Sequence, residues 1–241
     1  MDDLCDAIKK QVGKGIEETH QIGIFGNIPV PEECPICLVT MSMENQETIF
    51  TSCCAKVMCR ECDKKANDSL NGQLCPFCRM RRPSGRSEHL VALRTLAKKG
   101  DANAAIALSD AYRNGDGVEA SNYKSLKWAL TAASHGSPTA YGIFSMAYLN
   151  GVIVEKSPLE RRRCLEIAAK MGCIKARRTL ETIAATEGDH LGAILHMEIA
   201  ASAGCKVALT NCFEEYKRSG GITKSRLDEV LEHYKRNAEH E

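Results

Sequence analysis

Apolar residues recur at helical spacing through the C-terminal two thirds of the chain. From Ser87 onward, alanine, leucine and tyrosine return every three or four residues, so that one face of each predicted helix is apolar. Glycines spaced 36, 36 and 32 residues apart close four of these segments: Gly100, Gly136, Gly172 and Gly204. Glycine adopts the left-handed conformation of a helix C-terminus at the least cost. The pattern therefore predicts repeated units of helix, turn and helix.

A second set of markers repeats with the same spacing of 36 residues. These markers are Ala111-Tyr112 before Gly115, and Ala147-Tyr148 before Gly151. Since a single helical hairpin cannot bury its apolar face alone, a repeat of this length predicts an α-solenoid over residues 87–240. The predicted fold class is therefore mostly α. The repeats resemble the Sel1-like repeat family, a relative of the tetratricopeptide repeat, and this resemblance implies a surface that binds a substrate or scaffold protein.

Charge and hydropathy give no sign of a nucleic-acid or membrane partner. The 241 residues carry a formal net charge of +1, which produces no overall field toward anionic partners. The first six residues are acidic and lack the apolar run of a signal peptide, and no stretch reaches the roughly 20 apolar residues of a membrane span. We therefore expect a cytoplasmic or nuclear protein, or one found in both compartments.

Eight of the 13 cysteines fall between positions 34 and 78, a segment without histidine. They form four pairs: Cys34 with Cys37, Cys53 with Cys54, Cys59 with Cys62, and Cys75 with Cys78. In a reducing compartment, clustered pairs of this kind indicate metal ligands rather than disulfides. Two tetrahedral zinc sites need eight such ligands, and structural zinc contributes roughly 10–16 kcal/mol to folding. The segment therefore predicts two bound Zn²⁺ ions, which replace a hydrophobic core.

The order and spacing of the pairs resemble a RING finger. Fifteen residues separate Cys37 from Cys53, and 12 separate Cys62 from Cys75. Gln73 stands where a PHD finger usually has an aromatic residue, which counts against that family. The resemblance implies a short hairpin plus a helix, and a cross-brace in which alternate pairs share a metal. Its ligand sets are Cys34, Cys37, Cys59 and Cys62 for the first zinc, and Cys53, Cys54, Cys75 and Cys78 for the second.

One pair departs from the common RING pattern of cysteine, one residue and histidine. Here two adjacent cysteines, Cys53 and Cys54, are followed by Ala55 and Lys56. This matches an all-cysteine variety of RING. Two interpretations stay open: both cysteines bind the second zinc, or one is free and another donor completes the site.

The RING resemblance implies an E3 ubiquitin ligase that recruits a ubiquitin-conjugating enzyme charged with ubiquitin and forms no covalent intermediate. By position, Ile36, Pro76 and Phe77 correspond to contacts with the conjugating enzyme. Arg79, directly after the last ligand, corresponds to the linchpin that hydrogen-bonds both ubiquitin and the enzyme, a task suited to its planar fork of donors. Ile36 and Phe77 as internal packing, and Arg79 as a linker cation, are the alternatives. The alternative function is a non-catalytic zinc-binding scaffold for protein interactions.

These observations divide the chain into four segments. Residues 1–32 form an N-terminal segment that we expect to be partly helical and to end at Pro29 and Pro31. The RING-type module spans 33–80, a basic linker spans 81–86, and the repeats span 87–240. The basic linker also raises the possibility of nucleic-acid binding, which predicts a steep dependence of affinity on salt.

Overall fold

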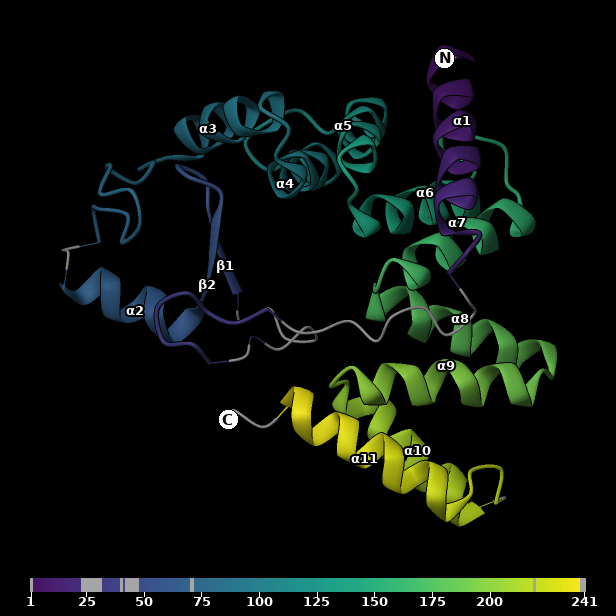
Figure 1. Ribbon diagram of the computed structural model, residues 1–241. Coiled ribbons are helices and arrows are strands. Elements are labelled where there is room, and N and C mark those ends of the chain that lie inside the picture. The colour runs from purple at the N-terminus through teal and green to yellow at the C-terminus, as the bar shows by residue number, and fades with distance from the viewer. Residues whose placement is uncertain are drawn as a thin grey trace. The chain divides into compact units, whose positions relative to one another are not determined.

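The computed structural model describes residues 2–22, 32–39, 41, 48–69, 72–218 and 220–238. This part of the chain forms eleven helices and one two-stranded antiparallel sheet (Figure 1), which confirms the mostly α fold class. Pro29 and Pro31, expected to end the first helix, lie outside the described residues. Among these residues, no helix has both the length and the apolar character that crossing a membrane requires.

The chain folds into two compact units. The first contains α1 (Asp2–Thr19), the β-sheet and the helices from α2 to α6, and the second contains α8 to α11. The sheet consists of β1 (Thr48–Thr51) and β2 (Lys56–Cys59), and α2 (Arg60–Ser69) follows directly. Thr48 pairs with Cys59, and Thr51 pairs with Lys56, so a four-residue turn joins the strands. The short hairpin followed by a helix is the arrangement that the sequence predicts.

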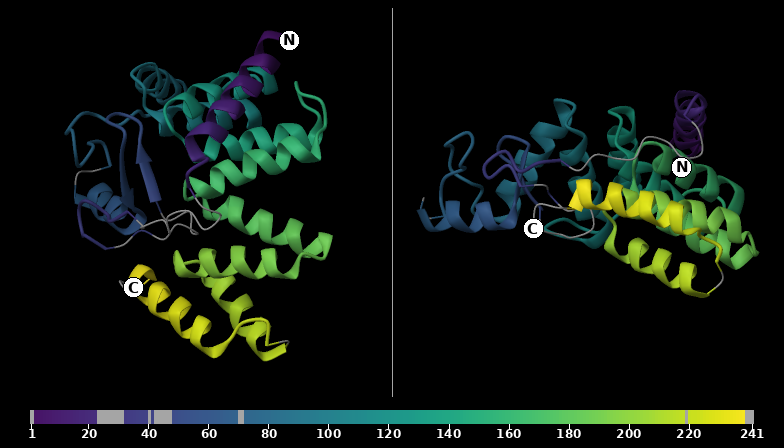
Figure 2. Two further views of the ribbon diagram at one scale, coloured as in Figure 1. Left: turned by 45° about the vertical axis from the view of Figure 1, so that its right-hand side comes forward. Right: turned by 60° about the horizontal axis from the view of Figure 1, so that its bottom comes forward.

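Nine further helices follow the small module, and Figure 2 shows them from two other sides. They are α3 (Arg86–Lys98), α4 (Ala102–Asn114), α5 (Asn122–Ser134), α6 (Pro138–Asn150), α7 (Pro158–Lys170), α8 (Ile174–Glu187), α9 (His190–Ser202), α10 (Lys206–Arg218) and α11 (Lys224–Ala238). From α3 to α8, alternate helices begin 36 residues apart, so each helix recurs with the predicted period. The predicted solenoid of helical hairpins is confirmed.

The turns between hairpins form where the glycine spacing predicts them. Gly100, Gly136, Gly172 and Gly204 all have positive φ, between 80° and 95°. The last interval shortens to 32 residues because Gly188 and Asp189 alone join α8 to α9. Asp189 caps α9 by accepting a hydrogen bond from the Gly192 N–H at 2.9 Å. A longer turn is unnecessary there because Asp189, the residue directly after Gly188, is already the N-cap of α9.

Small residues bring the helices close together in the core of each unit. Ala104, Ala105 and Ala129 are fully buried, and the Ser109 and Ser125 hydroxyls lie 3.0 Å apart between α4 and α5. In the second unit, the core joins α8, α9, α10 and α11 through Ile174, Met197, Cys212, Ile222 and Val230. The predicted apolar faces are thus the buried faces.

Candidate metal centre

The structure brings the eight clustered cysteines together in two groups of four. One group is Cys34, Cys37, Cys59 and Cys62, and the other is Cys53, Cys54, Cys75 and Cys78. Within each group all sulfur atoms lie within 4.8 Å of one another, and none of the eight cysteines forms a disulfide. Each group takes alternate pairs along the chain, the grouping that the resemblance to a RING finger implies. Both groups are close enough to hold a metal ion.

Two loops of identical hydrogen bonding carry the first and the last pair. In each loop the N–H of the leading cysteine donates to the carbonyl five residues later, and its carbonyl accepts from the N–H four residues later. The bonds are Cys34 N to Val39 O (2.9 Å), Leu38 N to Cys34 O (2.8 Å), Cys75 N to Met80 O (2.9 Å) and Arg79 N to Cys75 O (3.0 Å). The shared Cys-Pro-x-Cys sequence therefore folds the same way twice.

Each of these loops closes on a residue in the left-handed conformation. Leu38 has φ of 61° and Arg79 has φ of 59°, although neither is glycine. This conformation costs a residue with a side chain roughly 1–2 kcal/mol, and it persists where the surrounding structure determines it. Both side chains are exposed, and Leu38 retains 67% of its accessible surface.

The turn between β1 and β2 presents the adjacent cysteines. The buried Thr51 hydroxyl accepts from the Lys56 N–H at 3.1 Å and donates to the Lys56 carbonyl at 2.8 Å, which fixes the base of the turn. Ala55 completes the turn with φ of 60°. The Cys54 sulfur lies 3.3 Å from the Thr51 hydroxyl oxygen. Cys53 and Cys54 thus both belong to the second group. Most RING fingers have a cysteine, one other residue and a histidine at this place in the sequence, whereas this chain has two adjacent cysteines.

Sulfur distances in the second group suit a tetrahedral zinc site. The sulfurs of Cys54 and Cys75 lie 3.8 Å apart, and those of Cys53 and Cys78 lie 3.6 Å apart. Four sulfurs at the usual Zn–S distance of about 2.3 Å are about 3.8 Å from one another in a tetrahedron. A disulfide would instead require about 2.05 Å. The spacing fits sulfurs that surround one ion.

The thiols of the second group influence one another's protonation. Burial raises the pKa of the Cys53 thiol, and hydrogen bonds to Cys75 and Cys78 raise it further. Burial also raises the pKa of Cys75, but N–H groups of Cys78 and Phe77 and neighbouring thiols outweigh this effect and lower it to about 7. One thiolate forms easily, and its charge opposes a second. A bound divalent cation would remove this conflict, because a coordinated thiol is deprotonated.

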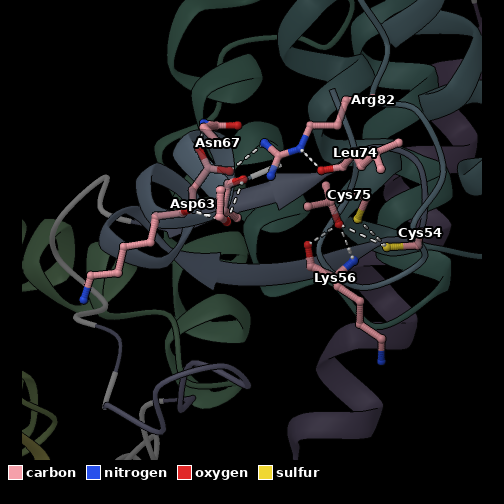
Figure 3. Close-up of polar contacts among 11 residues, drawn as sticks. Cys54, Lys56, Asp63, Asn67, Leu74, Cys75 and Arg82 are labelled. Carbon is pink, nitrogen blue, oxygen red and sulfur yellow. Dashed lines mark hydrogen bonds and ion pairs between the residues drawn. The ribbon is translucent and has the colours of Figure 1, made fainter. Parts of the chain in front are cut away.

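An ion pair that the sequence did not indicate supports the last cysteine pair. Arg82 donates through Nη1 to Asp63 Oδ1 of α2 at 2.7 Å and through Nε to the Leu74 carbonyl at 3.2 Å (Figure 3). Asn67 Nδ2 holds the other Asp63 oxygen at 3.2 Å. Arg82 therefore connects α2 to the strand-like segment next to Cys75. The sequence assigns Arg82 to the basic linker, where nothing distinguishes it from its neighbours.

Replacing Arg82 tests this support. We expect Arg82→Met to lower zinc affinity about 10-fold or more, the usual effect of losing a residue that positions metal ligands. The pair is largely shielded, with 20% and 15% of the two side chains exposed. Arg81→Met is the matched control, because Arg81 is exposed. Competition with a chromogenic chelator measures both variants, and equal zinc retention would contradict the assigned role.

The four residues assigned to enzyme and ubiquitin contact differ in exposure. Ile36, between the first two cysteines, keeps 46% of its surface exposed, and Arg79 is also exposed. Pro76 and Phe77 are half-buried. Ile36 and Phe77 occupy equivalent positions in the two similarly bonded loops. All four therefore retain accessible surface.

Comparison with known proteins bears on the helical repeats. No protein-family model matches the chain, and no curated protein matches it. A protective antigen present in uropathogenic Escherichia coli strains, which displays an SLR fold, is 19% identical with a TM-score of 0.50. The match covers 64% of this chain and 34% of that structure. The helical hairpins have the fold of Sel1-like repeats.

A Sel1 repeat protein from Oxalobacter formigenes is also similar. It is 29% identical, with a TM-score of 0.46 over 52% of this chain and 97% of that one.

Proposed function

We propose that the protein is a RING-type E3 ubiquitin ligase that binds two zinc ions and uses its Sel1-like repeats to hold a substrate or scaffold protein. The observation that carries the proposal is the interleaving of the cysteines. The first and third pairs form one group and the second and fourth pairs form the other. Separate zinc fingers would instead use neighbouring pairs. The hairpin that carries Cys53 and Cys54, and the helix that follows Cys59, agree with this assignment.

Catalysis of this kind depends on holding a thioester in a reactive arrangement. Ile36, Pro76 and Phe77 would contact the conjugating enzyme, and Arg79 would donate hydrogen bonds to the enzyme and ubiquitin together. Restricting the motion of the reacting groups and orienting donors supplies the acceleration. Zinc would serve a structural purpose by fixing the loops that carry these residues.

Two of the five cysteines outside the two groups, Cys164 and Cys212, support a non-covalent mechanism. Burial raises the pKa of Cys164 to about 12, and the nearby Glu160 adds to this effect. Burial likewise raises the pKa of Cys212 to about 12. A transfer nucleophile needs the opposite shift, because the thiolate is the reactive form. These thiols serve as buried apolar groups.

An autoubiquitination assay with a panel of conjugating enzymes tests the proposal. We expect Ile36→Ala and Arg79→Ala each to lower ubiquitin transfer at least 10-fold while two zinc ions remain bound. Ile36→Ala removes an apolar contact with the conjugating enzyme, and Arg79→Ala removes the oriented hydrogen-bond donors. Arg81→Ala is the matched control for charge in the same segment.

The scaffold alternative makes a different prediction. It has support of its own, because the repeat fold suits protein binding without any transfer reaction. Absence of transfer with every conjugating enzyme, from protein that holds two zinc ions, would establish the scaffold and overturn the ligase assignment.

A further inference from the structure

The segment between the cysteine module and α3 presents a serine directly after a basic stretch. Its sequence is Arg81-Arg82-Pro83-Ser84, so arginines stand three and two residues before the hydroxyl group. Protein kinases that select basic substrates recognise this spacing, because carboxylates in their substrate groove pair with the guanidinium groups. The basic linker therefore contains a phosphoacceptor of the type that these kinases modify.

Ser84 is exposed and lies outside regular secondary structure. Arg81, which is also exposed, forms an isolated antiparallel bridge with Leu74, and residues 82–84 then belong to no helix or strand. Pro83 has its φ fixed at about −65° and keeps the residue before it extended. A kinase binds its substrate as an exposed, extended segment. This stretch of the chain meets both requirements.

Glu88 of α3 holds the Ser84 hydroxyl in the unmodified chain. The Ser84 N–H and hydroxyl both donate to Glu88 Oε2, at 3.0 Å and 3.1 Å. These bonds lower the pKa of the Glu88 carboxyl group, so the carboxylate stays ionised. A phosphoryl group on Ser84 would remove the hydroxyl donor and bring a charge of about −1.5 to −2 against that carboxylate. Phosphorylation therefore breaks the contact with Glu88, and the phosphate needs a cationic partner.

Arg82 suits that role. Residues i and i+2 of an extended segment point to the same side, so we expect Arg82 to share a side with Ser84. Its Nη1 and Nε atoms donate to Asp63 and to the Leu74 carbonyl (Figure 3), whereas the buried Nη2 atom has no hydrogen-bond partner among the described residues. A phosphate offers three acceptor oxygens and more charge than a carboxylate, and arginine pairs with it through two parallel bonds. It would satisfy the donor that Asp63 leaves unused.

We propose that Ser84 is a phosphorylation site for a serine kinase that selects basic substrates, and that its phosphate takes Arg82 from Asp63. In the transfer, Ser84 Oγ bonds the terminal phosphorus of a nucleoside triphosphate while the bond from that phosphorus to its bridging oxygen breaks. The nucleoside diphosphate leaves with the bonding electrons, and the hydroxyl proton passes to a base of the kinase.

The modification acts on the metal centre through Arg82. Because the ion pair of Arg82 with Asp63 supports the last cysteine pair, its loss weakens the hold of the second group on zinc. This effect rests on the zinc-binding part of the proposed function, whereas phosphorylation of Ser84 and ubiquitin transfer are independent of each other.

Full-length, zinc-loaded protein incubated with MgATP and the catalytic subunit of cyclic-AMP-dependent protein kinase tests the site. We expect phosphate on Ser84, located by tandem mass spectrometry, and its loss in Ser84→Ala. Arg81→Met is expected to slow phosphorylation about 10-fold or more, because it removes an exposed guanidinium that pairs with the kinase. Arg86→Met is the matched control, since Arg86 is exposed but follows the serine, and its rate is expected to equal that of the wild type.

Zinc retention measures the consequence for the metal centre. Phosphorylated protein is expected to bind zinc about 10-fold more weakly in competition with a chromogenic chelator, as Arg82→Met does. Kinase-treated Ser84→Ala is expected to match untreated protein. Arg82→Met that is phosphorylated to completion is expected to show no additional loss, because its ion pair with Asp63 is already absent.

Opposite results would overturn the inference. A folded protein that takes no phosphate on Ser84, or takes it on Ser87 instead, contradicts the site. Phosphate on Ser84 with zinc affinity unchanged or increased contradicts the transfer of Arg82 from Asp63. Since mass spectrometry detects the phosphate without any conjugating enzyme, these outcomes are distinct from a failure of the ligase proposal.

Discussion

Removal of zinc is expected to unfold the cysteine module while the Sel1-like repeats stay folded. The described residues of this module bury few apolar side chains besides cysteine, namely Met41, Met58 and Ala66. Structural zinc contributes roughly 10–16 kcal/mol to such modules, far more than this small core supplies. The repeats bury apolar side chains of their own in each unit and need no metal. Amide exchange during chelation measures both parts: protection of β1, β2 and α2 is expected to disappear while that of α4 and α9 persists.

Metal content and single substitutions sharpen this prediction. We expect two zinc ions per chain, and a measured ratio near one would contradict the interleaved assignment. Cys75→Ser is expected to lose the second ion, because its buried sulfur lies 3.8 Å from that of Cys54. Cys173→Ser is the control, since Cys173 belongs to neither group. Cys53→Ser and Cys54→Ser, made separately, decide whether both adjacent cysteines bind metal.

The repeats were predictable because a short sequence pattern determines them, whereas the grouping of the cysteines followed from the resemblance to a RING finger. Gly136 and Gly172 mark turns that only a residue tolerant of positive φ forms easily, and their spacing sets the repeat. The clustered cysteine pairs likewise indicate metal ligands from residue type and spacing, but which pairs share one ion was implied only by the RING resemblance.

Contacts that depend on tertiary geometry were not predictable. Arg82 stands among several arginines, and its ion pair with Asp63 depends on the direction of α2. The positive φ of Leu38 has no signal in the sequence, because leucine disfavours that conformation. The ion pair between the buried Glu198 and the partly exposed Arg226 joins α9 to α11 and falls at no repeated position. Each of these features follows from neighbours that are distant in the chain.

The same reasoning explains α1. Its amphipathic pattern predicts a helix with one buried face, but it does not say which surface covers that face. The Gln11 side-chain amide donates to the Tyr141 hydroxyl of α6 at 3.1 Å, and a Cβ atom at Gly15 would lie only 2.7 Å from that hydroxyl. Gly15 therefore leaves the room that Tyr141 fills. The fit of one tyrosine ring against one glycine leaves no periodic pattern in a sequence.

Phe144→Ala is expected to destabilise the first unit by about 3–5 kcal/mol, the usual cost of removing a buried phenylalanine side chain. Phe144 is fully buried in α6, and its ring meets that of Tyr141 edge to face, with centroids 5.9 Å apart. The substitution leaves a cavity directly behind the residue that holds α1. We therefore expect weaker protection of α1 amides in addition to a lower free energy of unfolding. Denaturant titration and amide exchange measure the two effects.

Met146→Ala provides the matched control on the same helix. Met146 lies two residues further along α6 and keeps 48% of its surface exposed, so its loss is expected to change stability by less than about 0.5 kcal/mol. Both variants place alanine in the same helix, which cancels most of the difference in helix propensity. Equal destabilisation by the two variants would show that Phe144 does not anchor the core. Loss of stability without any change in α1 protection would mean that Tyr141 holds α1 without help from the ring behind it.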